Sequence, residues 1–307
     1  MTDQFPALPT ELLPADPRFG CGPSKVRPGQ IDAIVAGSRA IIGTSHRQPA
    51  VKNVVGSIRA GLAELFALPA GYEIVCSLGG ATAFWDAATF GLIAKKSGHL
   101  AFGEFSAKFA AASTKAPWLA EPTVISAEPG DAPSPQAMPG CDVIAWAHNE
   151  TSTGAMVPVT RPADSEGSLV VIDATSGAGG LPVDMSQADV YYFSPQKCFA
   201  SDGGLWFAAM SPAALERIAE INASDRFIPE FLNLQTAVDN SRKNQTYNTP
   251  AVATLLMLED QVKWMNDNGG LAGMVARSTA NSDTLYHWAD QREEASCFVS
   301  DPNKRSL

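Results

Sequence analysis

Short apolar runs mark the predicted strands of this chain. Four of them cover residues 143–147, 169–172, 190–193 and 205–210, and helical patterns or loops separate them. A fifth, at residues 72–76, lies earlier in the chain. The four later runs are apolar on both faces, which is typical of parallel strands that are buried on both sides. The pattern therefore predicts an α/β fold with a mostly parallel sheet covered by helices.

Helical spacing of apolar residues defines several other segments. It is found at residues 51–68, 251–266 and 271–289. Another helix is expected to begin at Gly79-Gly80-Ala81-Thr82 and to continue through about Lys95. Ser211-Pro212 predicts a further helix start, because proline is favoured at the first helical position. Residues 1–30 are rich in proline and glycine and predict an N-terminal arm.

Composition and charge narrow the function classes. The chain has 307 residues, of which 45% are hydrophobic, and this suits a globular protein with a large core. Its net charge of −10 argues against nucleic acid or an anionic membrane as a partner. Small anionic substrates stay possible, provided that a local group of basic residues binds them.

The five cysteines are scattered and form no Cys-x-x-Cys pair, so neither a disulfide framework nor a zinc site is indicated. Residues 1–14 lack the basic start and apolar core of a signal peptide. No apolar run is long enough to span a bilayer. We therefore expect a protein of the reducing cytoplasm.

An aspartate and a lysine follow two of the predicted strands. Asp173 ends the run at residues 169–172, and Lys197 comes shortly after the run at residues 190–193. Enzymes that use pyridoxal phosphate (PLP) need such a pair, because the lysine forms a Schiff base and the aspartate keeps the pyridinium nitrogen protonated. The apolar neighbours of Lys197 favour burial, which lowers the pKa of an amine. An aspartate that caps a turn and a lysine at a strand edge remain the simpler alternatives.

Three polar segments could bind the anionic parts of a ligand. Gly79-Gly80-Ala81-Thr82 runs from a strand into a helix start, where free amides and the helix dipole favour anions. Asn149-Glu150-Thr151 follows a strand, at the edge where open α/β sheets bind ligands. His46-Arg47 offers a fork for carboxylate or phosphate. Taken singly, the first segment is equally compatible with an ordinary turn. For the other two, a solvated loop and a surface arginine beside a structural histidine are the favoured interpretations.

The order of the segments is more specific than any one of them. They are Gly20-Cys21-Gly22-Pro23-Ser24, Ser45-His46-Arg47, Gly79-Gly80, Asn149-Glu150-Thr151, Asp173, Gln196-Lys197 and Thr246-Tyr247-Asn248-Thr249-Pro250. This order resembles that of the phosphoserine aminotransferases in the class V aminotransferase family, most closely the actinobacterial branch. The resemblance runs from about residue 18 to the end of the chain. It implies a fold-type-I, PLP-dependent transaminase that works as a homodimer.

The resemblance also implies a domain organisation. Residues 31–266 would form the large PLP-binding domain, and residues 267–307 would begin a small C-terminal α/β domain. Family members continue through the rest of that domain, whereas this chain stops at Leu307. We therefore expect either a fragment or an incomplete small domain.

The resemblance assigns roles to individual residues. Lys197 would form the Schiff base and then move the α-proton, Asp173 would pair with the pyridinium nitrogen, and Phe105 would stack on the cofactor ring. The residues expected to hold the ring and the phosphate are Gly80, Ala81, Thr82, Thr151 and Gln196. Asn248 and Thr249 would reach the phosphate of the neighbouring subunit's cofactor, while His46 and Arg47 would bind the anionic ends of the substrates. No metal is expected.

One departure concerns the phosphate of the substrate. Many family members carry an arginine directly after the paired glycines, where this chain has Ala81-Thr82. Lys243 is a candidate for the missing contact.

The resemblance implies amino transfer between L-glutamate and 3-phosphohydroxypyruvate, a step of serine biosynthesis, and an analogous step of pyridoxine biosynthesis is also open. Two alternatives remain. The chain could be another fold-type-I enzyme, such as a small-amino-acid transaminase or a cysteine desulfurase, although neither Cys198 nor Cys297 has an obvious position in a mobile loop. It could also bind the cofactor without catalysing a reaction.

Overall fold

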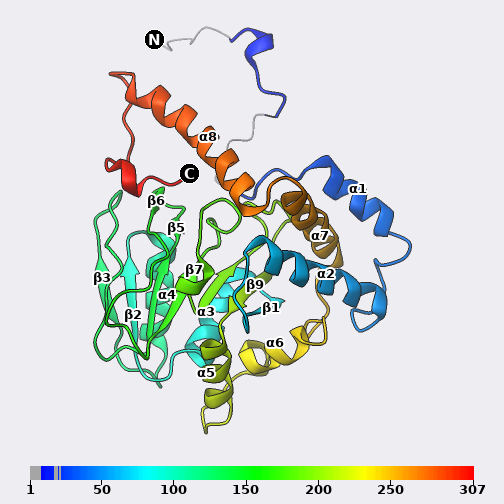
Figure 1. Cartoon of the computed structure of the whole chain (residues 1–307), viewed down its shortest axis with the longest axis vertical. Coiled ribbons are helices and arrows are strands. Elements are labelled where there is room, and N and C mark those ends of the chain that lie inside the picture. The colour runs from blue at the N-terminus through cyan, green and yellow to red at the C-terminus, as the bar shows by residue number, and fades with distance from the viewer. Residues whose placement is uncertain (1–7, 17–19, 21) are drawn as a thin grey trace, which may run out of the picture.

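A seven-stranded sheet runs through the centre of the molecule (Figure 1). The computed structural model describes residues 8–16, 20 and 22–307, so parts of the predicted N-terminal arm (residues 1–7, 17–19 and 21) lie outside the described residues. The strand order is β1-β9-β8-β7-β4-β2-β3. The strands are β1 (Glu73–Leu78), β2 (Ser97–Ala101), β3 (Thr123–Ser126), β4 (Val143–Ala147), β7 (Leu169–Asp173), β8 (Val190–Phe193) and β9 (Leu205–Met210), and β5 (Asn149–Glu150) and β6 (Ala155–Met156) pair in a separate ribbon.

Strand directions bring several strand ends to one edge of the sheet. Neighbouring strands from β3 to β8 are parallel, while β9 is antiparallel to both β8 and β1. The carboxyl ends of β1, β2, β4, β7 and β8 therefore lie at the same edge. This mixed, mostly parallel sheet confirms the predicted fold class, and in such sheets this edge is where ligands bind.

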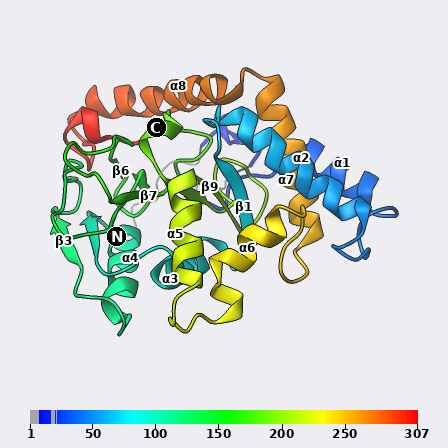
Figure 2. The same ribbon diagram turned by 60° about the horizontal axis from the view of Figure 1, so that its bottom comes forward.

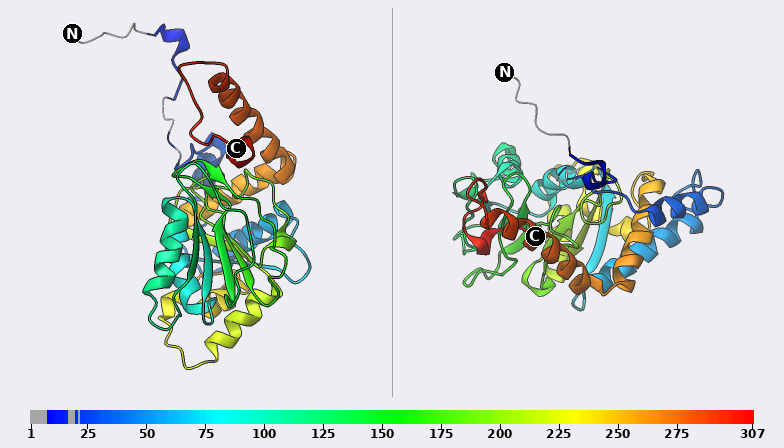
Figure 3. Two further views of the ribbon diagram at one scale, coloured as in Figure 1. Left: turned by 90° about the vertical axis from the view of Figure 1, so that its left-hand side faces the viewer. Right: turned by 90° about the horizontal axis from the view of Figure 1, so that it is seen from above.

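The helices of the described residues cover both faces of the sheet (Figures 2 and 3). They are α1 (Pro28–Gly37), α2 (Pro49–Leu65), α3 (Gly80–Gly91), α4 (Glu104–Lys115), α5 (Pro212–Asn222), α6 (Leu234–Ser241), α7 (Val252–Asp267) and α8 (Gly270–Asp290), with short 3-10 turns at Thr10–Leu12, Met185–Gln187, Glu230–Leu232 and Pro302–Lys304. Helices α2 and α7 lie side by side and cover one face, whereas α3, α4, α5 and α6 cover the other.

Strand β8 shows why the apolar runs have no polar positions. Tyr191 and Phe193 face the core under α2 and α7, and Tyr192 faces the core under α3. Phe84 of α3 stacks on Tyr192 with ring centroids 4.1 Å apart. Because successive side chains of a strand point to opposite faces, a strand covered on both sides must be apolar throughout.

Several predicted boundaries differ from the structure. Helix α1 begins at Pro28, inside the predicted arm of residues 1–30, and α3 ends at Gly91 rather than near Lys95. Residues 267–307 contain α8, the turn Pro302–Lys304 and a single bridge from Arg305 to Ala155. No helix among the described residues is both long and apolar enough to cross a membrane.

Candidate active site

A cavity of about 330 Å³ lies at the carboxyl edge of the sheet. Its lining residues follow β1, β2, β4, β7 and β8, which end at this edge. They are Gly79, Gly80, Ala81, Thr82, Trp85, Phe105, Asn149, Thr151, Asp173, Thr175, Ser176, Ser194, Gln196, Lys197 and Gly204. The volume is within the range of small-molecule sites. The cavity thus brings together eight of the twelve residues predicted from the sequence.

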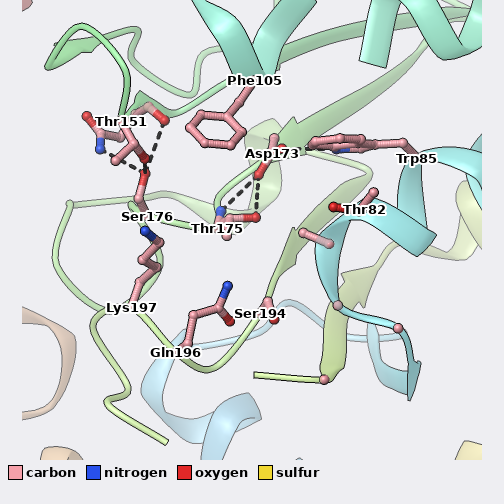
Figure 4. Close-up of a pocket in the computed structure, with 15 residues that line it drawn as sticks. Thr82, Trp85, Phe105, Thr151, Asp173, Thr175, Ser176, Ser194, Gln196 and Lys197 are labelled. Carbon is pink, nitrogen blue, oxygen red and sulfur yellow. Dashed lines mark hydrogen bonds between the residues drawn. The ribbon is translucent and has the colours of Figure 1, made fainter. Parts of the chain in front are cut away.

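Asp173 is the last residue of β7, and its carboxylate is almost fully buried. Thr175 donates to Oδ1 from its backbone nitrogen at 3.0 Å and from its hydroxyl at 2.6 Å. Trp85 Nε1 donates to Oδ2 at 3.2 Å (Figure 4). Burial raises the pKa of Asp173, while the hydrogen bonds from Thr175 and Trp85 oppose that rise. Since these donors are neutral, a cation bound in the cavity would further stabilise the ionised carboxylate.

Lys197 lies on the turn after β8 and is half-buried. The segment before α1 packs directly against this turn. Ser24 donates from its backbone nitrogen to the Gln196 carbonyl at 2.8 Å. At Gly22, a Cβ atom would lie only 2.6 Å from Lys197 Nζ. A side chain at Gly22 would therefore displace the end of the Lys197 side chain.

Gln30 of α1 is fully buried and contacts the same turn. Its side-chain nitrogen lies 3.1 Å from the Ala200 carbonyl and 3.0 Å from Ser201 Oγ. Ala200 has a φ of 48°, a left-handed conformation that is unfavourable for a residue with a side chain. Such conformations persist where the surroundings fix them. Gln30 is one of the residues that fix the turn carrying Lys197.

The start of α3 forms the wall opposite that turn. Gly79 and Gly80 have φ values of 97° and 67°, which glycine adopts without strain. No side chain caps this helix start. Gly80, Ala81 and Thr82 line the cavity, so the first turn of α3 can offer amide groups and the Thr82 hydroxyl to an anion.

A third side of the cavity is formed by Thr151, Asn149 and Ser176. Thr151 Oγ1 and Asn149 Nδ2 lie 2.7 and 2.8 Å from Ser176 Oγ. Figure 4 shows Thr151 and Ser176 beside Lys197. Asn149 Oδ1 and Gln196 Oε1 are buried without a hydrogen-bond partner in the described part of the chain. Buried polar atoms normally have partners, so both oxygens are available to donors of a ligand.

Phe105 closes the cavity from the first turn of α4, and Figure 4 shows its ring beside Asp173. The sequence predicted Phe105 as a cofactor-binding residue but did not predict helix α4, which carries it. It also missed Trp85, Thr175 and Ser176. Thr175 and Ser176 directly follow Asp173, and Trp85 lies three residues after Thr82, on the same side of a helix. Sequence spacing could therefore have indicated all three.

Four predicted residues lie away from this cavity: His46, Arg47, Asn248 and Thr249. We call them the His46–Thr249 cluster, because His46 Nδ1 lies 3.3 Å from Thr249 Oγ1. His46 is buried, whereas Arg47, Asn248 and Thr249 are exposed. Burial, and then the charge of Arg47, lower the pKa of His46. Lys243 is also exposed and does not line the cavity.

None of the described cysteines lines the cavity. Cys198 adjoins Lys197, but its thiol points to the Ser176 carbonyl at 3.7 Å. Burial raises the pKa of Cys198 to about 11, so the thiol is protonated near neutral pH. A protonated, buried thiol is a poor nucleophile.

Comparison with known proteins identifies the family and the fold. The family model "Aminotransferase class-V" matches residues 34–307, and the chain belongs to this family of aminotransferases. It is 79% identical over 307 residues to the phosphoserine aminotransferase of Corynebacterium glutamicum, covering all of this chain and 81% of that protein. It is 62% identical to the phosphoserine aminotransferase of Nocardioides sp., covering all of this chain and 82% of that protein.

Solved structures share the fold at low sequence identity. The phosphoserine aminotransferase of Cytophaga hutchinsonii superposes with a TM-score of 0.86 at 23% identity, covering 93% of this chain and 80% of that one. The phosphoserine aminotransferase of Trichomonas vaginalis, solved with PLP bound, gives a TM-score of 0.76 at 23% identity, covering 94% of this chain and 81% of that one. Both likenesses confirm the α/β aminotransferase fold.

The cofactor of the family is pyridoxal 5′-phosphate, and the cavity fits it. It holds an amine at Lys197, a buried carboxylate at Asp173 and an aromatic face at Phe105. Unpartnered buried oxygens and the start of α3 supply further polar contacts. A carboxylate whose pKa is raised by burial suits a ligand with a protonated ring nitrogen, because the two charges would compensate each other.

Proposed function

We propose that this chain is a phosphoserine aminotransferase. It would transfer an amino group between L-glutamate and 3-phosphohydroxypyruvate, with O-phospho-L-serine and 2-oxoglutarate as the products. The observation that carries the proposal is that a chain 79% identical to the Corynebacterium glutamicum enzyme gathers Lys197 and Asp173 in one cavity. The reaction belongs to serine biosynthesis, and the related step of pyridoxine biosynthesis would use the same chemistry.

The side chains of the cavity divide the work. PLP, when bound, supplies a ring that takes up the electron pair left at the substrate Cα. Lys197 Nζ would hold the cofactor and would carry a proton to and from the substrate Cα. Asp173 would pair with the protonated ring nitrogen, and Trp85 and Thr175 orient its carboxylate. Phe105 would cover the ring, and Thr82 and Thr151 line the same cavity.

We propose further that the enzyme is a homodimer in which the His46–Thr249 cluster completes the partner's cavity. Three residues of the cluster are exposed and carry the hydrogen-bonding groups expected of an anion site: Arg47, Asn248 and Thr249. The contact between His46 and Thr249 brings together the two residues expected to bind substrate, His46 and Arg47, and the two expected to bind the cofactor phosphate, Asn248 and Thr249. Tyr247, which directly precedes Asn248, is a large exposed hydrophobic residue, as expected where a second copy docks.

The other assignments have weaker support. A desulfurase requires a reactive thiol at the cofactor, and no described cysteine lines the cavity. A cofactor-binding but inactive chain would hold PLP without turnover. A cytoplasmic location is proposed because four described cysteines are free thiols.

The test is an assay of the purified chain with PLP. We expect 2-oxoglutarate to form from L-glutamate only when 3-phosphohydroxypyruvate is present, and no sulfide to form from L-cysteine. Sulfide release would support the desulfurase assignment. Bound PLP without turnover of either substrate would contradict the proposed activity while leaving the cofactor site intact.

A further inference from the structure

Phe105 and Thr151 line the same cavity but come from separate parts of the chain. Phe105 lies in the first turn of α4, and Thr151 follows the short strand β5. The four N–H groups at the start of any α-helix have no partner within the helix. At α4, the residue before the helix is Gly103, which has no side chain to cap them.

The cap of α4 comes instead from the two neighbours of Thr151. Glu150 Oε2 accepts from the Ser106 backbone nitrogen at 2.9 Å, and its Oε1 accepts from the Phe105 backbone nitrogen at 3.3 Å. Ser152 Oγ accepts from the backbone nitrogen of Glu104 at 3.0 Å. The loop that carries Thr151 therefore holds the helix that carries Phe105.

The carboxylate of Glu150 is fully buried, and neutral donors surround it. The Ser106 hydroxyl donates at 2.8 Å, as does the Ser152 hydroxyl. Hydrogen bonds to an ionised carboxylate are stronger than neutral ones, and a helix start favours negative charge. A buried anion with this many donors fixes both segments.

Gly103 makes this close approach possible. A Cβ atom at this position would overlap with Glu150 Cγ and Cδ, and it would lie 2.6 Å from Ser152 Oγ. Thr151, the residue after Glu150, forms a 2.7 Å hydrogen bond with Ser176, which follows β7. Glu150 thus connects the wall that holds Phe105 with the wall that holds Asp173.

We propose that Glu150 is a positioning residue of the active site. It does not line the cavity, and it acts by fixing the ring of Phe105 relative to Thr151 and Asp173. This inference rests on the proposed function, because it concerns the binding of PLP. If α4 is released, only a fraction of the molecules holds Phe105 in place, and the apparent dissociation constant rises as that fraction falls.

The test compares Glu150→Gln with Glu104→Gln. Both changes remove one negative charge at the start of α4, but the Glu104 side chain is exposed and pairs with Lys108. For each variant we would measure the PLP dissociation constant and the circular dichroism of the visible band of bound PLP. We expect Glu150→Gln to raise the dissociation constant about 10-fold and to weaken the visible band, with an unchanged far-ultraviolet spectrum. Glu104→Gln should match the wild type.

A second variant covers the case in which Glu150→Gln does not fold. Ser106→Ala removes one hydroxyl donor to Glu150, and a rise of about threefold in the dissociation constant is expected. Wild-type values for the foldable variant, in both measurements, would overturn the inference. A wild-type chain that does not bind PLP would instead refute the proposed function.

Discussion

The cavity at Lys197 and the His46–Thr249 cluster differ in how complete they are within one chain. The cavity is built from five strand ends and is lined by Lys197, Asp173 and Phe105. The cluster carries Arg47 and Thr249 at an exposed surface, and its residues do not line the cavity. One chain therefore gathers Lys197, Asp173 and Phe105 in its own cavity. The residues expected for anionic substrates, and those expected for the phosphate of a partner's cofactor, lie outside that cavity.

The difference has a physical origin. Parallel strands end at one edge of the sheet, so residues that follow them meet within a single chain. The cluster instead joins the segment between α1 and α2 to the loop before α7, through His46 and Thr249. A position outside the cavity suits residues that serve a second copy, because the two cavities of a twofold-symmetric dimer can each receive the partner's surface.

The largest effect is expected for Lys197→Ala. Without the amine, the cavity keeps its shape but has no group to hold the cofactor covalently or to move the proton. The rate of amino transfer should fall by more than about 10³-fold, with an unchanged far-ultraviolet spectrum. Stopped-flow or coupled assays would measure the rate. Lys263→Ala removes an exposed lysine that pairs with Asp267, and it should keep the wild-type rate.

The second prediction tests whether the cluster serves the partner. Arg47→Ala should lower kcat/KM for the phosphorylated substrate about 10- to 100-fold, because charge-assisted hydrogen bonds are lost. Lys197→Ala and Arg47→Ala chains should complement each other when they are co-expressed. With random pairing, about half of the dimers contain one chain of each kind. Each of these mixed dimers has one intact site out of two, so the mixture should show about a quarter of wild-type activity.

Complementation distinguishes the two arrangements sharply. If Arg47 acted in the cavity of its own chain, every cavity in a hybrid would be defective. Mixed dimers would then be no more active than the average of the two parents. That result would place the cluster within one subunit.

A smaller effect is expected when the contact between Gln30 of α1 and the turn that carries Lys197 is removed. Gln30→Met keeps the length of the side chain but removes its hydrogen bonds to Ala200 and Ser201. The free energy of unfolding should fall by about 1–3 kcal/mol, since buried polar groups lose their partner. The rate at which Lys197 reacts with PLP should fall as well. Gln235→Met, on α6 with its amide hydrogen-bonded to Asp239, is the control that should leave that rate unchanged.

The last effect concerns the pH dependence of stability alone, and it does not depend on dimer formation. His148 is buried, its backbone nitrogen donates to the Asp173 carbonyl at 2.8 Å, and burial lowers the pKa of its side chain to about 4 from the usual 6.5. As the pH falls from 6.5 towards 4, the unfolded chain gains a proton that the folded chain does not, so stability is lost. His148→Gln should reduce that loss by about 1.4 kcal/mol per pH unit.

Urea unfolding at pH 7, 6 and 5 would measure this slope. The exposed His287 gives a control, since His287→Gln should retain the wild-type slope. An unchanged slope in His148→Gln would contradict the assignment of a neutral, buried histidine.

Much of the fold could be predicted because burial on both faces leaves a clear pattern. The apolar runs at β4, β7, β8 and β9 were found in this way. Strand β2 was missed, although it is fully buried, because Ser97 and His99 are polar. Their side chains hydrogen-bond to each other, and His99 also contacts Ser113 of α4. Such pairing depends on tertiary structure and leaves no local pattern.

The site divides in the same way. Lys197 and Asp173 could be found because each directly follows an apolar strand. Helix α4 could not, since its cap comes from Glu150 and Ser152, more than forty residues later in the chain. The domain boundaries and the roles of individual site residues stay predictions until such variants are measured.

The most direct test of the central claim is to find which residue binds the cofactor. The protein would be mixed with PLP, reduced with borohydride, digested and analysed by mass spectrometry. The account predicts a phosphopyridoxyl group on the peptide that contains Lys197, and none on Lys243 or Lys263. A label on a lysine outside the cavity, or no label on a protein that catalyses amino transfer, would contradict it.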